Sequence, residues 1–182
     1  MEQYPKRKRN RIEDFDYSQD GVYFITILTA NRLHILWDSV RADIIRPDRV
    51  PLSDIGRLVE QAILQISGHY NGVTVDKYCI MPDHVHLLLR IEREDDGRGA
   101  MGAPTASGRM ISALTRGTAP SIPVVVGSLK RWVSRQVGTS IWHKSFYDHC
   151  IRNQKDYDET WQYIEQNPLK YKLGYRRGGA GR

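Results

Sequence analysis

The sequence predicts an α+β domain in which an antiparallel sheet is covered by helices, as in ferredoxin-like folds built from split βαβ units. Segments rich in β-branched and aromatic residues alternate with segments of helical periodicity. Two of the expected strands are separated by only a Pro-Asp turn, and 182 residues is about the length of one domain. The expected order is strand, helix, strand, strand, helix, strand, helix.

The first two elements follow from local patterns. Val22–Thr29 is β-branched and aromatic and is bounded by Asp-Gly and Ala-Asn-Arg, so a strand is expected. Apolar residues then recur at helical spacing from Leu52 to Ile66, which predicts a helix. Ser53 is its expected N-cap, and Gly68 is expected to end it.

A hairpin and a long excursion follow. Strands are expected at Val73–Met81 and His84–Ile91, joined across Pro82-Asp83. Residues 92–122 are rich in Gly, Ala, Ser, Thr and Pro and have no hydrophobic period. We therefore expect a mobile insertion there rather than a domain boundary.

The last third of the chain predicts a helix, a strand and a final helix. The helix spans about 124–138, and its expected packing face consists of Val125, Leu129, Trp132, Val133 and Gln136. A strand is a candidate over Ile141–Ile151. The final helix, 155–167, is expected to stop at Pro168, and 173–182 to form a disordered tail. Residues 15–172 are thus expected to be a single domain.

Composition narrows the class of partner and the compartment. The chain has 27 Lys+Arg against 21 Asp+Glu, a net charge of +6, which favours a polyanionic partner. Residues 1–14 form a basic arm that is either a solvated tail or a nucleic-acid contact, with the candidates Lys6, Arg7, Lys8 and Arg9. Because the N-terminus has no apolar leader and no segment approaches a membrane span, a cytoplasmic location without membrane contact is expected. The two cysteines, Cys79 and Cys150, are expected to be interior thiols.

The stretch MPDHVHLLLR places two histidines two residues apart at the start of an expected strand. Residues at that spacing point to one face, so His84 and His86 project together while Val85 and Leu87 point into a core. The pair could hold one divalent ion, or each histidine could be a polar residue on a half-exposed strand. A catalytic metal site would need at least one further donor.

The final helix offers such a donor. Tyr163 and Asn167 are four residues apart and share one helical face, so a phenol and an amide lie one turn apart. Trp161, Ile164 and Tyr157 occupy a neighbouring stripe that would pack the helix on the sheet. Taken alone, Tyr163 could equally be a packing tyrosine and Asn167 a helix-ending residue before a proline.

Four blocks in order carry a resemblance to a known family. DYSQDGVYFITILTANR (16–32), KYCIMPDHVHLLLR (77–90), the tryptophan-containing SIWHKSFYDHCIRNQKDYD (140–158) and YIEQNPLKY (163–171) are similar to the single-tyrosine HUH transposases. Within that class they most resemble the REP-associated tyrosine transposases, relatives of the insertion sequence 200/605 enzymes. The blocks and the elements between them cover nearly the whole chain outside 92–122 and the tail.

The resemblance implies an HUH endonuclease fold and a role for each motif residue. His84 and His86 match the HUH triplet, Tyr163 matches the nucleophile, and Asn167 matches an amide third ligand. Such enzymes cut single-stranded DNA next to hairpins through a 5′-phosphotyrosine, rejoin strands by the reverse attack, require Mg²⁺ or Mn²⁺, and usually act as homodimers. The phosphate would lie at the metal, which can neutralise charge developing on it.

Several assignments stay open on sequence alone. Tyr147 is a competing nucleophile because it lies in a family-like block, although only Tyr163 has a donor one helical turn away. Asp83, where relatives often have Asn, either caps the turn, which we favour, or adds a carboxylate near the metal. Beyond the basic arm, phosphate contacts are expected from Arg32 and Arg90. Lys130, Arg131 and Arg135 either contact phosphates too or form a solvated helix face.

Two other functional classes fit the same motifs. One is a metal-dependent phosphodiesterase or nuclease in which water replaces the tyrosine. The other is a non-catalytic nucleic-acid-binding module on a ferredoxin-like sheet, although the strands lack an RNP-like aromatic motif.

Overall fold

A computed structural model describes residues 19–38, 50–92 and 120–173 of the chain. In these ranges a single four-stranded antiparallel sheet has the order β2-β3-β1-β4. The strands are β1 (Gly21–Leu28), β2 (Val73–Ile80), β3 (His84–Ile91) and β4 (Tyr147–Cys150). The order places β3 between the two strands of a split βαβ unit, so the predicted fold class is confirmed.

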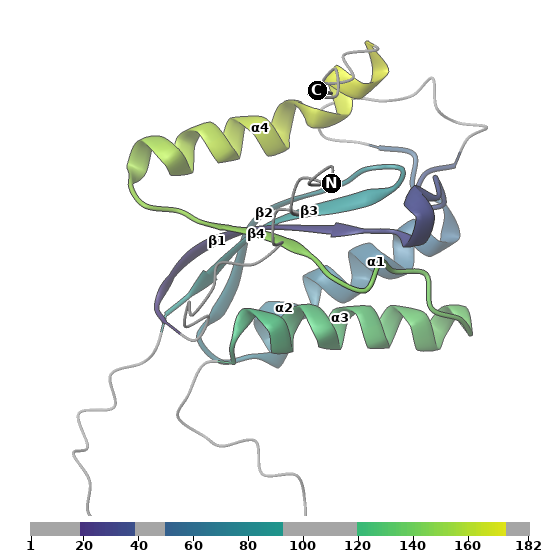
Figure 1. Cartoon of the computed structure of the whole chain (residues 1–182), viewed down its shortest axis with the longest axis horizontal. Helices are drawn as coiled ribbons and strands as arrows, with labels where there is room; N and C mark the ends of the chain where they lie inside the picture. Colours follow the sequence, from purple (N-terminus) through teal and green to yellow (C-terminus); the bar gives the residue numbers. More distant parts are fainter. Residues whose placement is uncertain (1–18, 39–49, 93–119, 174–182) are drawn as a thin grey trace, which may run out of the picture.

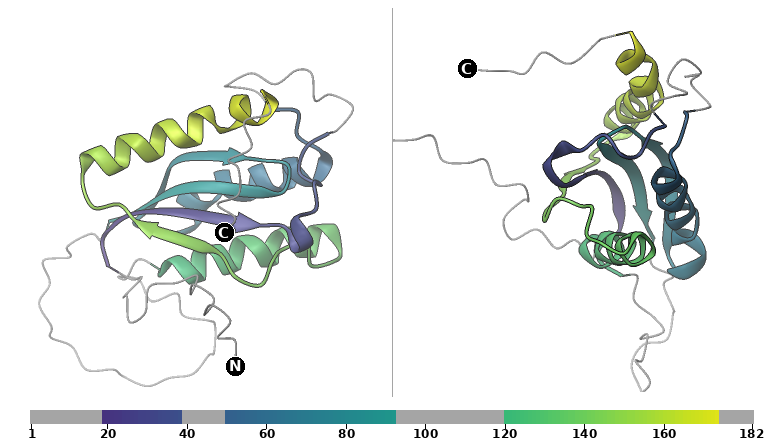
Figure 2. Two further views of the ribbon diagram at one scale, coloured as in Figure 1. Left: turned by 45° about the horizontal axis from the view of Figure 1, so that its top comes forward. Right: turned by 90° about the vertical axis from the view of Figure 1, so that its right-hand side faces the viewer.

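Helices cover the sheet unequally. They are η1 (Ala30–Arg32), α1 (Asp54–Leu64), α2 (Ile66–His69), α3 (Ile122–Val137) and α4 (Gln154–Lys172). Figure 1 shows α1, α2 and α3 beneath the sheet and α4 alone above it, and the views in Figure 2 agree. Within the described ranges, no helix combines the length and the apolar character that a membrane span requires.

Strand alternation decides what each face of the sheet presents. On β3, Val85, Leu87 and Leu89 are fully buried in the core shared with α1 and α3. The intervening residues, His86 and Leu88, face α4. The histidines therefore lie on the opposite face of the sheet from its larger hydrophobic core.

A β-bulge in β2 fastens α4 to the sheet. The register shifts between Val75 and Lys77, so Asp76 is the extra residue and both Asp76 and Lys77 reach the α4 side. The Asp76 carboxylate accepts a hydrogen bond from the Tyr157 hydroxyl of α4 at 3.1 Å. Lys77 Nζ lies 3.1 Å from the Glu165 carboxylate of the same helix. These two contacts fix the position of the helix that holds Tyr163.

Two predicted helix ends are wrong. Gly68 lies inside α2, because Gln65 keeps a helical conformation between α1 and α2 and the chain extends only at Tyr70. Pro168 lies inside α4, which continues to Lys172. Proline costs one backbone hydrogen bond, but the following turn gains packing, since the Tyr171 ring lies 5.4 Å from that of Trp37.

Two other predicted boundaries also need correction. Ile122, placed at the end of the insertion, is fully buried and begins α3; residues 93–119 lie outside the described part of the chain. The strand predicted over 141–151 is reduced to β4 and one bridge from Trp142 to Thr29. Lys130 Nζ donates to two carbonyls in this stretch, those of His143 and Ser145, which satisfies them outside the sheet. The basic arm, 1–14, and tail residues 174–182 also lie outside the described ranges.

Most of the other packing predictions are confirmed. Ser53 caps α1 by accepting a hydrogen bond from Gly56 N at 3.0 Å. On α3 the predicted face is buried at Val125, Leu129 and Val133, whereas Gln136 is exposed and does not belong to it. Both cysteines are free, Cys79 buried and Cys150 half-buried.

Candidate active site

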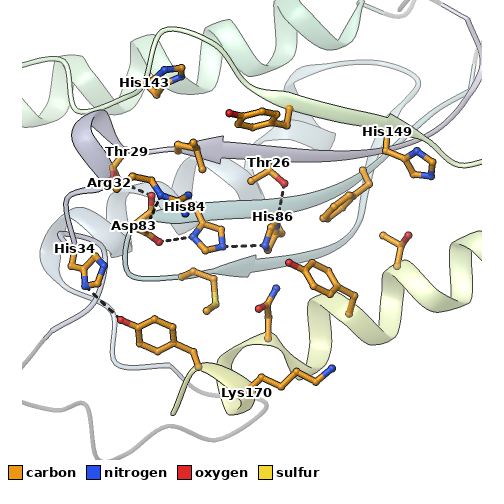
Figure 3. Close-up of a pocket in the computed structure, with 18 of the residues that line it drawn as sticks. Thr26, Thr29, Arg32, His34, Asp83, His84, His86, His143, His149 and Lys170 are labelled. Carbon is orange, nitrogen blue, oxygen red and sulfur yellow. Dashed lines mark hydrogen bonds and ion pairs between the residues drawn. The ribbon is translucent and has the colours of Figure 1, made fainter. Parts of the chain in front are cut away.

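A groove runs between the sheet and α4, with one wall from the strands and the other from the helix (Figure 3). Its strand wall includes β1, β3 and β4, and its helix wall is a stripe of α4 at three- and four-residue spacing. The lining residues used below are Phe24, Thr26, Arg32, His34, Asp83, His84, His86, Tyr147, His149, Asp156, Glu159, Tyr163, Asn167 and Lys170. The groove therefore brings together both predicted metal-binding histidines, the predicted amide and both candidate tyrosines.

The two histidines lie side by side, with their Nε2 atoms 3.1 Å apart. Each ring is held through its other nitrogen: His84 Nδ1 lies 2.5 Å from Asp83 Oδ1, and His86 Nδ1 lies 2.9 Å from Thr26 Oγ1. Figure 3 draws this chain of contacts from Asp83 to Thr26. Metal-binding histidines typically have one nitrogen fixed by such a partner, which orients the other toward the ion.

Asp83 is a carboxylate partner of His84 and not only a turn residue. It is 7% exposed, and its second oxygen lies 3.2 Å from Arg32 Nε. Burial acts to raise the pKa of Asp83, but the hydrogen bond with His84 and the charges of His84, Arg32 and His34 outweigh it and lower the pKa. An ionised carboxylate can only accept, so His84 Nδ1 donates this hydrogen bond. The favoured turn-only role for Asp83 is therefore wrong.

His86 is the more buried of the pair, at 4% exposure. Burial, followed by the neighbouring His84, lowers its pKa well below the ordinary value, while Asp83 acts in the opposite direction. The ring is therefore neutral at pH 7 and has one nitrogen with a lone pair. The Thr26 hydroxyl can donate or accept, so it can satisfy Nδ1 of His86 in either neutral tautomer.

Tyr163 contacts His86 directly. Its ring centroid lies 5.3 Å from that of His86, at an interplanar angle of 64°, and 5.9 Å from that of Phe24. The adjacent Ile164 is buried beneath α4, as the predicted packing stripe requires. Packing of α4 on the sheet thus places the phenol next to the histidines.

Asn167 lies one turn beyond Tyr163 on the same wall of the groove. Its side-chain Nδ2 is buried and has no hydrogen-bond partner among the described residues. A buried N–H donor without a partner is costly, and a hydrogen-bond acceptor in the groove, such as a phosphate oxygen, would remove that cost, whereas a cation would bind the amide oxygen. The predicted stop at Pro168 would have made Asn167 a helix terminus, whereas it lies within α4.

The donor set fits a divalent cation. Two imidazoles with fixed Nδ1 atoms and the Asn167 side chain line one groove, and Mn²⁺ or Mg²⁺ accepts imidazole nitrogen and amide oxygen ligands. Among the described residues, no group of three or more His, Cys, Asp or Glu side chains is arranged to hold a metal. Asn167, whose side chain lines the same groove, is the candidate for a third protein ligand.

Tyr147, the competing nucleophile, lies on the edge strand β4, two strands away from His86. It pairs with Thr26 of β1, which in turn pairs with His86, so the three side chains share one face across neighbouring strands. Tyr147 is 45% exposed. Both tyrosines line the groove, but Tyr163 is the one in ring contact with His86.

The predicted phosphate contacts fall in different places. Arg32 lines the groove, where its backbone adopts a positive φ of 57°. Arg90 instead pairs with Asp76 at 2.6 Å beneath α4. Lys130, Arg131 and Arg135 lie on α3, on the other side of the sheet, and the four arm residues lie outside the described ranges. DNA contacts by any of these residues remain predictions.

Sequence reasoning missed three groove residues. Thr26 holds His86, but only the strand register shows that the two are paired. Lys170 was missed because the helix was predicted to stop at Pro168. It lies in α4, seven residues after Tyr163 on the same helical face. His34 lies in a loop without a motif, with its Nδ1 3.5 Å from the Tyr171 hydroxyl.

Comparisons with known proteins agree with the motifs. No family model matches the chain. An uncharacterized Haemophilus influenzae protein is 26% identical over 90% of this chain and 88% of its own length. A second protein of that organism, whose name includes REP-associated tyrosine transposase, is 28% identical over 86% of this chain and 74% of its own length. An Escherichia coli REP-associated tyrosine transposase is 22% identical over 85% of this chain and 70% of its own length.

A solved structure shares the fold. The REP-associated tyrosine transposase bound to a REP hairpin superposes with a TM-score of 0.57 at 19% identity, covering 88% of this chain and 74% of that one. The resemblance predicted from the four sequence blocks is therefore confirmed: over most of its length, this chain is similar in sequence to proteins named REP-associated tyrosine transposase and has the fold of one of them.

Proposed function

We propose that this chain is a transposase that cleaves and rejoins single-stranded DNA next to hairpins of the REP type. Tyr163 is the nucleophile, and His84, His86 and Asn167 hold Mg²⁺ or Mn²⁺. The observation that carries the proposal is the contact between the Tyr163 ring and the neutral, buried His86 in one groove. Similarity to named transposases, and the hairpin held by a protein of the same fold, support the substrate class.

The chemistry assigned to the chain is a reversible phosphoryl transfer. The Tyr163 hydroxyl loses its proton and its oxygen forms a bond to phosphorus as the bond to the 3′ oxygen breaks. The leaving 3′ oxygen takes up a proton, so the products are a 5′-phosphotyrosine and a 3′-hydroxyl. A bound cation would neutralise charge developing on the non-bridging oxygens. The phenol is a poor nucleophile at its ordinary pKa near 10 and needs activation in the groove. Because the tyrosine ester conserves the bond energy, a second 3′-hydroxyl can reverse the step.

The protein groups divide this work by position. Asp83 and Thr26 orient the two imidazoles through their Nδ1 atoms. The Asp76 and Lys77 contacts hold α4, and therefore Tyr163, over the sheet. A homodimer and a cytoplasmic location are further predictions that accompany this proposal.

The test is to trap the covalent intermediate. A labelled DNA hairpin with single-stranded flanks is incubated with protein and Mg²⁺ or Mn²⁺, then separated under denaturing conditions. The wild type should give a protein–DNA band that is absent from Tyr163→Phe and His84→Ala. Tyr70→Phe, on the opposite face of the sheet, is the matched control and should still give the band.

The other outcomes discriminate between mechanisms. Cleavage without any covalent band, and equally fast in Tyr163→Phe, would indicate a water nucleophile and a nuclease. Binding without cleavage across a panel of hairpins, unaffected by chelator, would indicate a non-catalytic module. Loss of the band in Tyr147→Phe but not in Tyr163→Phe would transfer the nucleophilic role to Tyr147.

A further inference from the structure

The edge strand β4 presents two exposed rings to the groove. Tyr147 and His149 are two residues apart on the strand, so both side chains point to the α4 side, and both line the groove. Tyr147 is 45% exposed, a large exposure for a side chain with an apolar ring. An exposed aromatic ring beside a site for single-stranded DNA is a surface on which an unpaired base can stack.

The charges along the groove differ between its two ends. Arg32, His34 and Lys170 line the end near the start of β3, and Figure 3 draws Arg32 and His34 on one side of the histidine pair with His149 on the other. The opposite end contains Asp156 and Glu159, in the first turns of α4. Since Asp156 and Lys170 are 14 residues apart on one helix, the two ends are separated by about 21 Å.

His149 does not reverse the charge of the acidic end. Its Nε2 lies 2.9 Å from the Asp156 carboxylate. Burial acts to raise the pKa of Asp156, but the backbone hydrogen bond from Arg152 and the contact with His149 outweigh it and lower the pKa, so this carboxylate is ionised near neutral pH. Glu159 adds a second acidic side chain to the same wall and lies 3.8 Å from Lys155 Nζ. The acidic lining makes this end less attractive to phosphates than the end with Arg32 and Lys170, whereas it does not repel uncharged bases.

We propose that Tyr147 is a base-stacking residue that holds an unpaired DNA base beside the phosphate at the histidine pair. The inference rests on the proposed function, which places single-stranded DNA in the groove. Tyr147, Thr26 and His86 form one row across three strands, so Tyr147 stands about 10 Å from His86, two strand spacings away. A base stacked on Tyr147 of β4 would therefore have its backbone phosphate nearer to His86 of β3.

The inference gives the second tyrosine of the groove a role that differs from nucleophilic attack. Stacking requires the ring and not the hydroxyl, whereas attack on phosphorus requires the hydroxyl. Tyr147→Phe and Tyr147→Ala therefore separate the two roles. Because the side chain is half exposed, Tyr147→Ala is expected to leave the fold intact, as circular dichroism would verify.

The experiment uses a DNA hairpin in which 2-aminopurine replaces each unpaired base flanking the stem in turn. Fluorescence quenching and affinity are measured in a Tyr163→Phe background, which keeps the strand intact. At one or two positions the protein should quench the probe, and Tyr147→Ala should remove the quenching and weaken binding by about 5- to 150-fold. Tyr147→Phe should restore both, and Val124→Ala, exposed on α3, is the matched control.

The outcomes separate this inference from the proposed function. Quenching and affinity unchanged by Tyr147→Ala would overturn the stacking role, as would a Tyr147→Phe variant that behaves like Tyr147→Ala. If the wild type forms no covalent adduct but Tyr147→Ala still removes the quenching, the proposed chemistry fails and the stacking role stands. A covalent adduct that forms through Tyr147 would overturn the inference and not the class of reaction.

Discussion

The two faces of the sheet come from the same strands but differ in composition. Toward α1 and α3, β3 contributes Val85, Leu87 and Leu89, all fully buried in an apolar core. Toward α4, the same strand contributes His84 and His86, which line a groove. One strand can thus stabilise the core with every second residue and line a candidate active site with the residues between. Substitutions on the two faces should therefore affect different properties.

The largest effect is expected on the α4 side. His86→Ala removes one of three predicted metal ligands and should slow formation of the DNA adduct by about 1,000-fold, the cost of removing a preorganised group that stabilises transition-state charge. The unfolding free energy should change less than for a substitution in the apolar core. Cleavage kinetics and urea denaturation of the same preparation measure both. Adduct formation at the wild-type rate would show that His86 has no part in the reaction.

The neighbouring residue should show the opposite pattern. Leu87 is fully buried against α1 and α3, so Leu87→Ala should lower the unfolding free energy by about 2–5 kcal/mol through lost burial and the cavity that remains. Leu87→Met, which conserves volume, should cost less than about 1.5 kcal/mol. Urea denaturation checks both values. A loss below about 1 kcal/mol for Leu87→Ala would mean that this face does not provide the stabilising core.

A smaller effect is expected one layer behind the histidines. Asp83→Asn keeps the volume and an acceptor oxygen but removes the charge that holds His84, so Mn²⁺ affinity should fall by about 10- to 100-fold. Isothermal titration calorimetry measures it without any need for DNA cleavage. Asp54→Asn, at an exposed position on α1, should leave Mn²⁺ affinity unchanged. Equal affinity in Asp83→Asn and the wild type would remove Asp83 from the site.

The smallest effect concerns whether DNA also reaches the α3 side. Replacing Lys130 and Arg131 together should weaken binding to hairpin DNA and flatten its salt dependence, with the logarithmic slope falling by about 0.7–0.9 per lost phosphate contact. Lys170→Ala, in the groove, should reduce the logarithmic salt slope by the amount of one phosphate contact, about 0.7–0.9. Fluorescence anisotropy over a salt series gives both slopes. Unchanged binding in the Lys130 and Arg131 variant at moderate salt would confine DNA to the α4 side.

The period of two residues in a strand predicted much of the difference between the two faces of the sheet. The alternation in HVHLLL assigns the histidines and the leucines to opposite faces, and helical spacing brings Tyr163 and Asn167 to one face of a helix. Both inferences need only local geometry. The fold class followed in the same way, from the order and spacing of the elements.

The remaining features depend on contacts between distant segments. Thr26 and His86 are 60 residues apart and meet only through the register of β1 and β3. Arg32 reaches Asp83 because the loop after β1 turns back with positive φ at Asn31 and Arg32, and for Arg32 the residue type does not indicate this. Local propensity also failed at Pro168, because packing of Tyr171 on Trp37 outweighs the helix-breaking tendency of proline.

The most direct measurement is the identity of the residue that becomes bonded to DNA. After reaction with a hairpin substrate, the protein is digested with protease and nuclease, and the peptide that retains a nucleotide is sequenced by tandem mass spectrometry. We expect a single modified residue, Tyr163, with the nucleotide joined through its 5′ phosphate. A nucleotide on Tyr147, or a cleaved strand with no modified peptide at all, would contradict the account.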